Sequence, residues 1–257
     1  MFSPRDQGRT MLLRSITKHV RDQNWLAVFL DFVIVVVGIL IAFQITNWNE
    51  GRADRQKEVE FFESVLENLR SDLAEYDSTL TVTEWRMSAI NQINREITGT
   101  DIPHSLINPL EVQEIIEPTP EFDFGTAGPT AIAFLATFEG DRSAFDALIS
   151  TGDIRIIRNK KLLKELQDYY VRMDGFDEME KRLTVFRDQL HEQRSLAGVA
   201  STDQMTIGEL ADIVAEHPAF FASMRGSWHF SEFHRRGIIG ERKAVEALIA
   251  RIESGDN

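Results

Sequence analysis

The chain has 257 residues and a formal net charge of −13, with 41 acidic side chains against 28 basic ones. It contains no cysteine, which excludes disulfides, zinc–thiolate sites, cysteine-ligated iron–sulfur clusters and cysteine nucleophiles. An acidic chain is repelled by phosphate backbones, so we expect no nucleic-acid partner.

A short basic tail, residues 1–24, opens the chain. Its five basic side chains outnumber its two acidic ones, and they are Arg5, Arg9, Arg14, Lys18 and Arg21. So short a segment cannot bury a core of its own. We therefore expect the folded part of the protein on the C-terminal side of this tail.

An apolar stretch follows, and we predict a transmembrane helix over residues 25–47. Residues 25–43 carry one charge, Asp31, and at about 1.5 Å per residue they can cross a bilayer core of about 30 Å. Trp25 and Trp48 bracket the stretch as interfacial anchors do. No small-x-small cleavage site follows, so an uncleaved signal anchor is favoured over a cleaved signal. A buried core helix is the alternative.

The distribution of basic residues predicts the orientation. Five precede the apolar stretch, and the first fifteen residues after it carry three, Arg52, Arg55 and Lys57. By the positive-inside rule the N-terminus is cytoplasmic. The expected location is a bacterial inner (plasma) membrane, with residues 48–257 forming an exported domain that is periplasmic or extracellular. A cytoplasmic domain is the opposite possibility.

Asp31, Gly38 and Ala42 fall near one face of the predicted span, at about 100° per residue. Gly38 and Ala42 form a small-xxx-small pair that lets two helices approach closely. The Asp31 carboxylate either reaches toward the near interface or makes a polar contact with another span. This face is the candidate site for association between spans, which would make the protein a homo-oligomer through the span and the stalk.

A long stalk helix is predicted over about residues 52–98. A 3,4 alternation typical of a coiled coil or a long bundle helix runs through it, at Val59, Phe62, Leu66, Leu69, Leu73, Tyr76, Leu80, Thr83, Met87, Ile90, Asn94 and Ile97. No proline interrupts the chain from Leu26 to Thr98. The stripe packs either against other helices of the same chain, which we favour, or against a partner protein.

Residues 99–140 are rich in proline and glycine, which predicts loops. A short helix after Asn108 and an acidic, solvated loop are expected there, at Glu111, Glu114, Glu117, Glu121 and Asp123. Asp141 can cap a helix from Ser143 to Ser150, which Gly152 would end. Asp153–Ile157 is predicted to be a turn or an edge strand.

A long second helix over about residues 159–196, capped by Asn159, again steps by three and four. Two such helices in one chain predict an antiparallel pair. Three helical runs follow, at 206–216, about 218–235 and 239–254. The expected fold is therefore all-α: one transmembrane helix continuing into a stalk that packs in a helical hairpin or bundle.

No sequence pattern for phosphate, dinucleotide or zinc-protease chemistry occurs. His229, Glu232 and His234 form the densest ligand-type group, but His234 points about 140° away from His229 on a helix. Accordingly we predict no catalytic residues, no metal site and no cofactor.

The residues from Asp31 to Glu50 resemble the opening span of a family of bacterial single-pass membrane proteins of unknown function. Those proteins carry an acidic residue, a Gly-Ile-Leu-Ile-Ala run and then Asn-Trp-Asn-Glu. A second block, from Ser143 to Tyr170, resembles the family's turn into a Tyr-Tyr helix. Asp31 and Thr46 depart from the usual residues. The resemblance implies topology and no chemistry.

The expected function is a membrane-anchored envelope protein that is not an enzyme. It would be a scaffold or a sensor acting through a protein partner, with the lipid bilayer as its other contact. The alternative is a membrane-tethered hydrolase that uses carboxylates or His229 and His234 in the exported domain.

Overall fold

The computed structural model describes residues 25–104 and 128–255, and the part it describes is helical, with no strand. The predicted all-α class is confirmed. The chain divides into two units, Met1–Lys57 and Glu58–Asn257. The basic tail 1–24 lies outside the described residues, and so do the short helix and the acidic loop expected within residues 105–127.

Helix α2 (Trp25–Thr98) is a single helix of 74 residues. It confirms that the apolar stretch and the stalk form one helix, which Gly51 does not interrupt. In the first unit none of the most apolar 18-residue window is buried. A buried core helix, the alternative, would be mostly buried, and this window is not.

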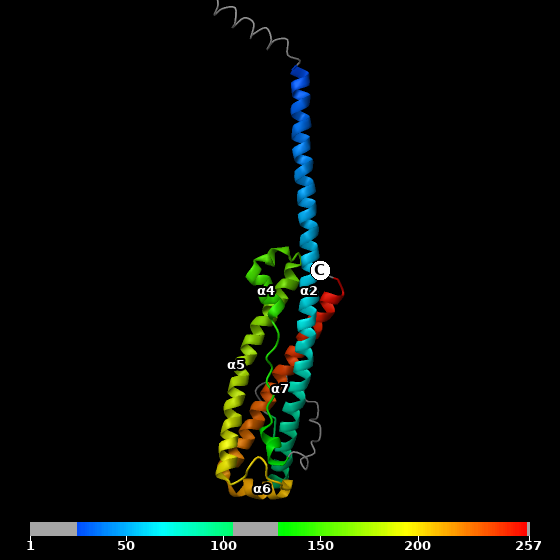
Figure 1. Ribbon diagram of the computed structural model, residues 1–257. Helices are drawn as coiled ribbons and strands as arrows, with labels where there is room; N and C mark the ends of the chain where they lie inside the picture. The colour runs from blue at the N-terminus through cyan, green and yellow to red at the C-terminus, as the bar shows by residue number, and fades with distance from the viewer. Residues whose placement is uncertain (1–24, 105–127, 256–257) are drawn as a thin grey trace, which may run out of the picture. The chain divides into compact units, whose positions relative to one another are not determined.

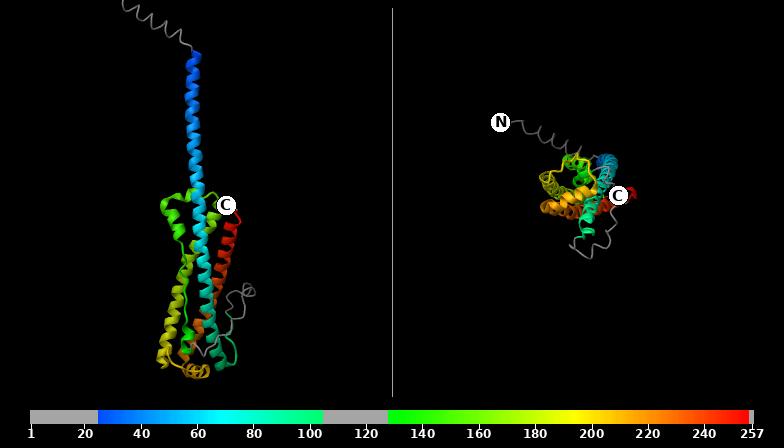
Figure 2. Two further views of the ribbon diagram at one scale, coloured as in Figure 1. Left: turned by 45° about the vertical axis from the view of Figure 1, so that its right-hand side comes forward. Right: turned by 90° about the horizontal axis from the view of Figure 1, so that it is seen from below.

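The second unit is a helical bundle. Helices α5 (Lys160–Leu196) and α7 (Pro218–Glu253) run beside the part of α2 that follows Lys57, as Figure 1 shows. Helix α6 (Ile207–Glu216) crosses one end, where α5 leads into α7. Helix α4 (Ser143–Thr151) lies toward the other end, and the two views of Figure 2 agree with this arrangement. Two 3₁₀ helices, η2 (Gly128–Ala133) and η3 (Asp153–Ile156), complete the described elements.

The structure confirms the helix ends predicted at Asn159 and Gly152 and corrects the N-cap predicted at Asp141. The Asn159 side chain accepts hydrogen bonds from the backbone N–H groups of the second and third residues of α5, as an N-cap does. Gly152 ends α4 with φ of 75°. Asp141 accepts from the backbone N of Ser143 at 2.8 Å, although Arg142 occupies the N-cap position. The segment Asp153–Ile156 is a 3₁₀ turn and not an edge strand.

Helix α7 corrects the prediction of two helices at 218–235 and 239–254, because it runs unbroken from Pro218 to Glu253. Gly237 lies inside it for a packing reason. A Cβ atom at this position would come within 2.9 Å of the Phe176 ring and 3.1 Å of the Met179 methyl group. The glycine therefore lets α7 approach α5 closely and does not mark a helix end.

The buried face of α2 lies to one side of the predicted stripe. Seven stripe residues are buried, but Leu66, Leu73, Leu80 and Ile97 are only partly buried, and Val59 is exposed. The seven are Phe62, Leu69, Tyr76, Thr83, Met87, Ile90 and Asn94. Other buried positions step between them, among them Val65, Asp72, Thr79, Arg86 and Ile93. The helices of the same chain cover this face, as favoured above.

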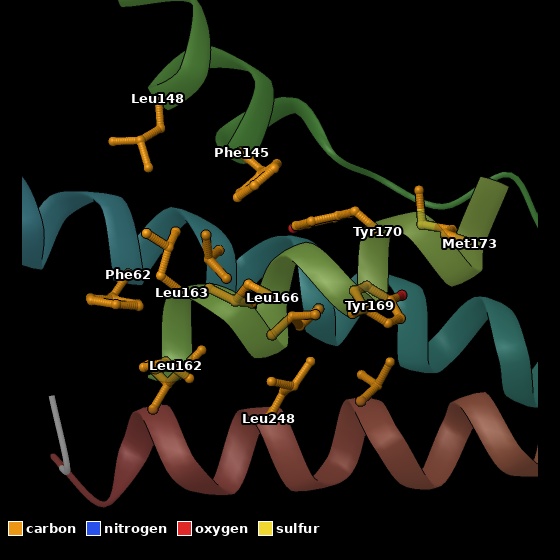
Figure 3. Close-up of a cluster of buried hydrophobic side chains, with 14 of the residues drawn as sticks. Phe62, Phe145, Leu148, Leu162, Leu163, Leu166, Tyr169, Tyr170, Met173 and Leu248 are labelled. Atoms are coloured by element: carbon orange, nitrogen blue, oxygen red, sulfur yellow. The ribbon is translucent and has the colours of Figure 1, made fainter. Parts of the chain in front are cut away.

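The core consists of two apolar clusters at different levels of the bundle. One joins α2, α4, α5 and the end of α7, and Figure 3 shows its α5 side chains, such as Leu166 and Tyr169, between α4 and α7. The other joins the end of α2 with η2, α6 and the start of α7, around Ile90 and Trp228. A layer of polar side chains separates the two clusters.

Candidate functional site

The polar layer consists of buried side chains from three helices, which α2, α5 and α7 turn toward one another: Thr79, Thr83, Arg86, Glu180, Ser231 and His234. None is more than 3% exposed. Burying polar and charged groups is costly unless they bind one another. The layer is therefore the place where this fold departs most from an apolar helical core.

Glu180 and His234 form its centre. One Glu180 oxygen lies 2.8 Å from Nε2 of His234, and Nδ1 of His234 lies 3.3 Å from the Thr83 hydroxyl oxygen. Because the ionised carboxylate only accepts, Nε2–H donates to Glu180 and Nδ1 accepts from Thr83. Burial lowers the pKa of His234, outweighing the hydrogen bond and charge of Glu180, and the Arg86 charge lowers it further. His234 is therefore neutral near pH 7.

Arg86 is a buried cation without a carboxylate in contact among the described residues. Its Nε donates to the Ser231 hydroxyl at 2.8 Å, and one terminal nitrogen donates to the Phe134 carbonyl. The other terminal nitrogen, Nη2, has no hydrogen-bond partner in the described part of the chain. Burial lowers the pKa of Arg86 to about 10, so the guanidinium stays charged at neutral pH.

A non-helical segment, residues 134–142, threads the bundle between α2 and α5, and we call it the strap (Figure 1). It has no strand partner, yet its successive backbone N–H groups are satisfied by carboxylates. Glu180 accepts from Phe138 at 3.0 and 2.9 Å with its two oxygens. Glu75 accepts from Glu139 at 2.9 Å and from Gly140 at 3.1 Å.

Asp72 completes this series. It accepts from the backbone N of Asp141 and from the Tyr169 hydroxyl, each at 2.7 Å. Burial raises the pKa of Asp72 to about 6, although both hydrogen bonds lower it. Three carboxylates from two helices thus hold the backbone of the strap. The ring of Phe138 fixes it further by stacking on Tyr76, with centroids 3.8 Å apart.

The geometry of Thr83, His234 and Glu180 has the order hydroxyl, imidazole, carboxylate that activates a nucleophile in hydrolases. Here all three side chains are closed to solvent. Two surface pockets lie elsewhere, one around Leu248 and Arg251 and another around Asn68 and Ser143. In this state the layer can position groups and store charge, but it offers no substrate access.

The histidines and carboxylate noted in the sequence are not brought together. His234 belongs to the polar layer, whereas Glu232 binds His104 at 2.7 Å and Arg236 at 2.6 Å. His229 is partly exposed on another side of α7. Within residues 25–104 and 128–255, no group of three or more His, Asp or Glu side chains could hold a metal ion.

The span residues remain open on the surface of α2. Asp31, Gly38 and Ala42 are all exposed, and a Cβ atom on Gly38 would meet nothing within 4 Å. Trp25 and Trp48 are exposed as well. The association of spans through this face therefore stays a prediction.

The sequence did contain a signal for the polar layer and for Asp72. Thr79, Arg86 and Asp72 each lie three residues after one stripe residue and four before another. Glu180 likewise follows Phe176 by four and precedes Leu183 by three. A polar side chain at such spacing inside an apolar stripe predicts a buried polar group.

Comparison with known proteins gives one finding. Residues 31–102 match a family of unknown function, DUF6090. The match supports the resemblance of the Asp31–Glu50 block and covers most of α2, including Asp72, Glu75, Thr83 and Arg86. The Ser143–Tyr170 block lies outside it. No curated protein and no solved structure matches the chain.

Proposed function

We propose that the chain is a membrane-anchored envelope protein that is not an enzyme, a helical bundle that acts through protein partners as a scaffold or a sensor. One observation carries the proposal. Within the single helix α2, no residue of the most apolar window is buried, whereas one face of the helix after Lys57 is buried in a bundle core. A bilayer would remove that apolar surface from water.

Membrane attachment is tested by fractionating cells that make the full chain. We expect it in the membrane pellet after alkaline extraction, with an N-terminus that still contains the basic tail. A signal sequence has the same apolar character, so N-terminal sequencing of the mature protein distinguishes the two. A soluble product, or one that begins after the apolar stretch, would disprove the anchor.

The proposed orientation places the N-terminus in the cytoplasm of a bacterium and the bundle outside its inner membrane. A reporter enzyme that is active only after export, fused after Asn257, should be active. A matched fusion of a reporter that works only in the cytoplasm should be silent. The reverse pattern would place the bundle in the cytoplasm.

The Asp31, Gly38 and Ala42 face is the proposed contact between two copies of the span. Because the chain has no cysteine, a single Gly38→Cys substitution reports on this contact alone. Oxidation in membranes should crosslink it efficiently, whereas Leu40→Cys, about 200° around the helix, should crosslink poorly. Equal crosslinking at both positions would argue against this face.

The hydrolase alternative is favoured only by the order Thr83, His234, Glu180. Thr83→Val removes the hydroxyl while keeping the side-chain shape, and His229→Ala removes the other histidine. Loss of cellular function by either variant, with the protein still folded and in the membrane, would favour an enzyme. Under our proposal both retain function, and co-purification in mild detergent identifies the partner.

A further inference from the structure

Asp72 is a buried carboxylate whose two hydrogen-bond donors are both neutral. Its side chain belongs to a residue only 1% exposed. The backbone N of Asp141 and the hydroxyl of Tyr169 each donate to it at 2.7 Å. Among the described residues, no Lys, Arg or His side chain forms an ion pair with it. A buried carboxylate in such surroundings is poorly stabilised when it is charged.

The groups that face Asp72 from neighbouring elements reinforce this. Glu75 on α2 and Asp141 on the strap add like charge. On α5 the nearest ionisable groups are the hydroxyls of Tyr169 and Tyr170, whose pKa values burial raises, so both are neutral.

The cations at this level are engaged elsewhere. Arg142 lies over the Tyr170 ring and binds Asp146 and Asp174. On α7, Arg242 binds Asp77. The carboxylate of Asp72 therefore has no competing source of charge compensation in the described structure.

The part of the strap that Asp72 holds is attached to α2 by few hydrogen bonds. Gly140 has φ of 66°, a conformation that glycine adopts freely. The backbone N–H groups of residues 139–141 bind only the Glu75 and Asp72 carboxylates. Releasing these bonds frees three backbone N–H groups without breaking a strand ladder.

We propose that the strap is a proton-controlled clasp, in which protonated Asp72 holds residues 139–142 closed against α2 and ionisation of Asp72 loosens them. When protonated, Asp72 still accepts the Asp141 N–H with its carbonyl oxygen, and its new hydroxyl can donate to the Tyr169 oxygen. When ionised, Asp72 is stabilised most by hydration, and water reaches it only if the strap opens.

The direction of the pH effect follows from linkage. Burial raises the pKa of Asp72 to about 6 with the strap closed, whereas an open, solvated Asp72 returns toward 3.8. The proton therefore stabilises the closed strap fully below the solvated value. That contribution is lost as the pH rises through about 6.

Hydrogen exchange of the strap amides tests the clasp in the full-length protein, held in nanodiscs of uncharged lipid. Protection factors at residues 139–141, corrected for intrinsic exchange rates, should fall about tenfold from pH 5 to pH 7.5. Asp72→Asn keeps an acceptor for Asp141 but cannot ionise, so its protection should not vary with pH through this window. Glu63→Gln, an exposed change on the same helix, should behave as wild type.

Tyr169→Phe provides a second test, also if Asp72→Asn fails to fold. The Tyr169 hydrogen bond lowers the pKa of Asp72, so its removal should shift the midpoint of the transition to higher pH. A wild-type protection that does not change with pH would overturn the proposal. So would an equal change in Asp72→Asn, or an unshifted midpoint in Tyr169→Phe.

Discussion

Glu180 on α5 and His234 on α7 bind each other at 2.8 Å in the interior of the bundle. The same carboxylate accepts the backbone N of Phe138, so a single side chain joins two helices and the strap. His234 in turn packs its ring against Phe176, with centroids 5.3 Å apart. Polar and apolar contacts thus specify the same alignment of α5 and α7.

Removing the Glu180 carboxylate should destabilise the bundle strongly. Glu180→Ala leaves two buried donors, on Phe138 and His234, without an acceptor, which costs about 2–4 kcal/mol. Chemical unfolding of the full-length protein in detergent, followed by circular dichroism, measures this. The control is Glu178→Ala on the exposed side of α5, where the change should stay within about 0.5 kcal/mol. Equal effects would mean that the Glu180 bonds contribute little.

The stability of the bundle should depend on His234 at mildly acidic pH. Burial lowers the pKa of His234 below its ordinary 6.5, so the contribution of neutral His234 is present above pH 6.5. It is lost as the pH falls toward the lowered value. The difference in unfolding free energy between wild type and His234→Gln should therefore shrink from pH 7.5 to pH 5. A difference that stays constant would show that His234 does not titrate differently on unfolding.

Gly237 should resist a substitution that helices usually favour. Alanine gains about 1 kcal/mol over glycine inside a helix, but here its Cβ would lie 2.9 Å from the Phe176 ring. We expect Gly237→Ala to destabilise by about 1–2 kcal/mol, since the ring is confined in the core. Gly240→Ala is the matched control on α7, where nothing lies within 4 Å, and it should stabilise. Thermal unfolding of both variants measures these changes in stability.

Alanine substitutions at two glycines with positive φ distinguish the cost of backbone strain from the cost of close packing. Gly140 and Gly152 have φ of 66° and 75°, but a Cβ on Gly140 would meet Met173 Sδ at 2.6 Å, and one on Gly152 would meet nothing within 4 Å. Alanine at either position costs about 1–2 kcal/mol for the left-handed conformation. Gly140→Ala should cost at least about 1 kcal/mol more, because the strap must shift. Similar losses in denaturant unfolding would contradict the close approach.

Helical periodicity made the fold predictable. A 3,4 pattern without proline required one long helix, and Asn159 marked the start of α5 with its side-chain cap. Periodicity located the stripe on α2 only approximately, because it was traced mainly through apolar residues. Asp72 and Arg86 were not part of it, although both lie on the buried face.

The strap and the break assumed in α7 escaped prediction for different reasons. The strap is held by backbone N–H groups, which leave no pattern in the sequence, and Glu75 is one of many acidic residues in an acidic chain. In α7, a break was predicted between residues 235 and 239, but the helix continues there and Gly237 lets Phe176 approach closely. Only the three-dimensional structure distinguishes a glycine that permits a turn of the backbone from one that lets a neighbouring side chain approach.

Carboxylates that accept hydrogen bonds from backbone N–H groups constrain the sequences of the two bonded segments unequally. The donors at residues 138–141 exist whatever side chains those residues carry, apart from proline. Glu139 is exposed, so its side chain can vary without loss of these bonds. Glu75, Asp72 and Glu180 can be replaced only by residues that also supply an acceptor. Among relatives of this chain, we expect the three carboxylates, Phe138 and Gly140 to vary less than Glu139.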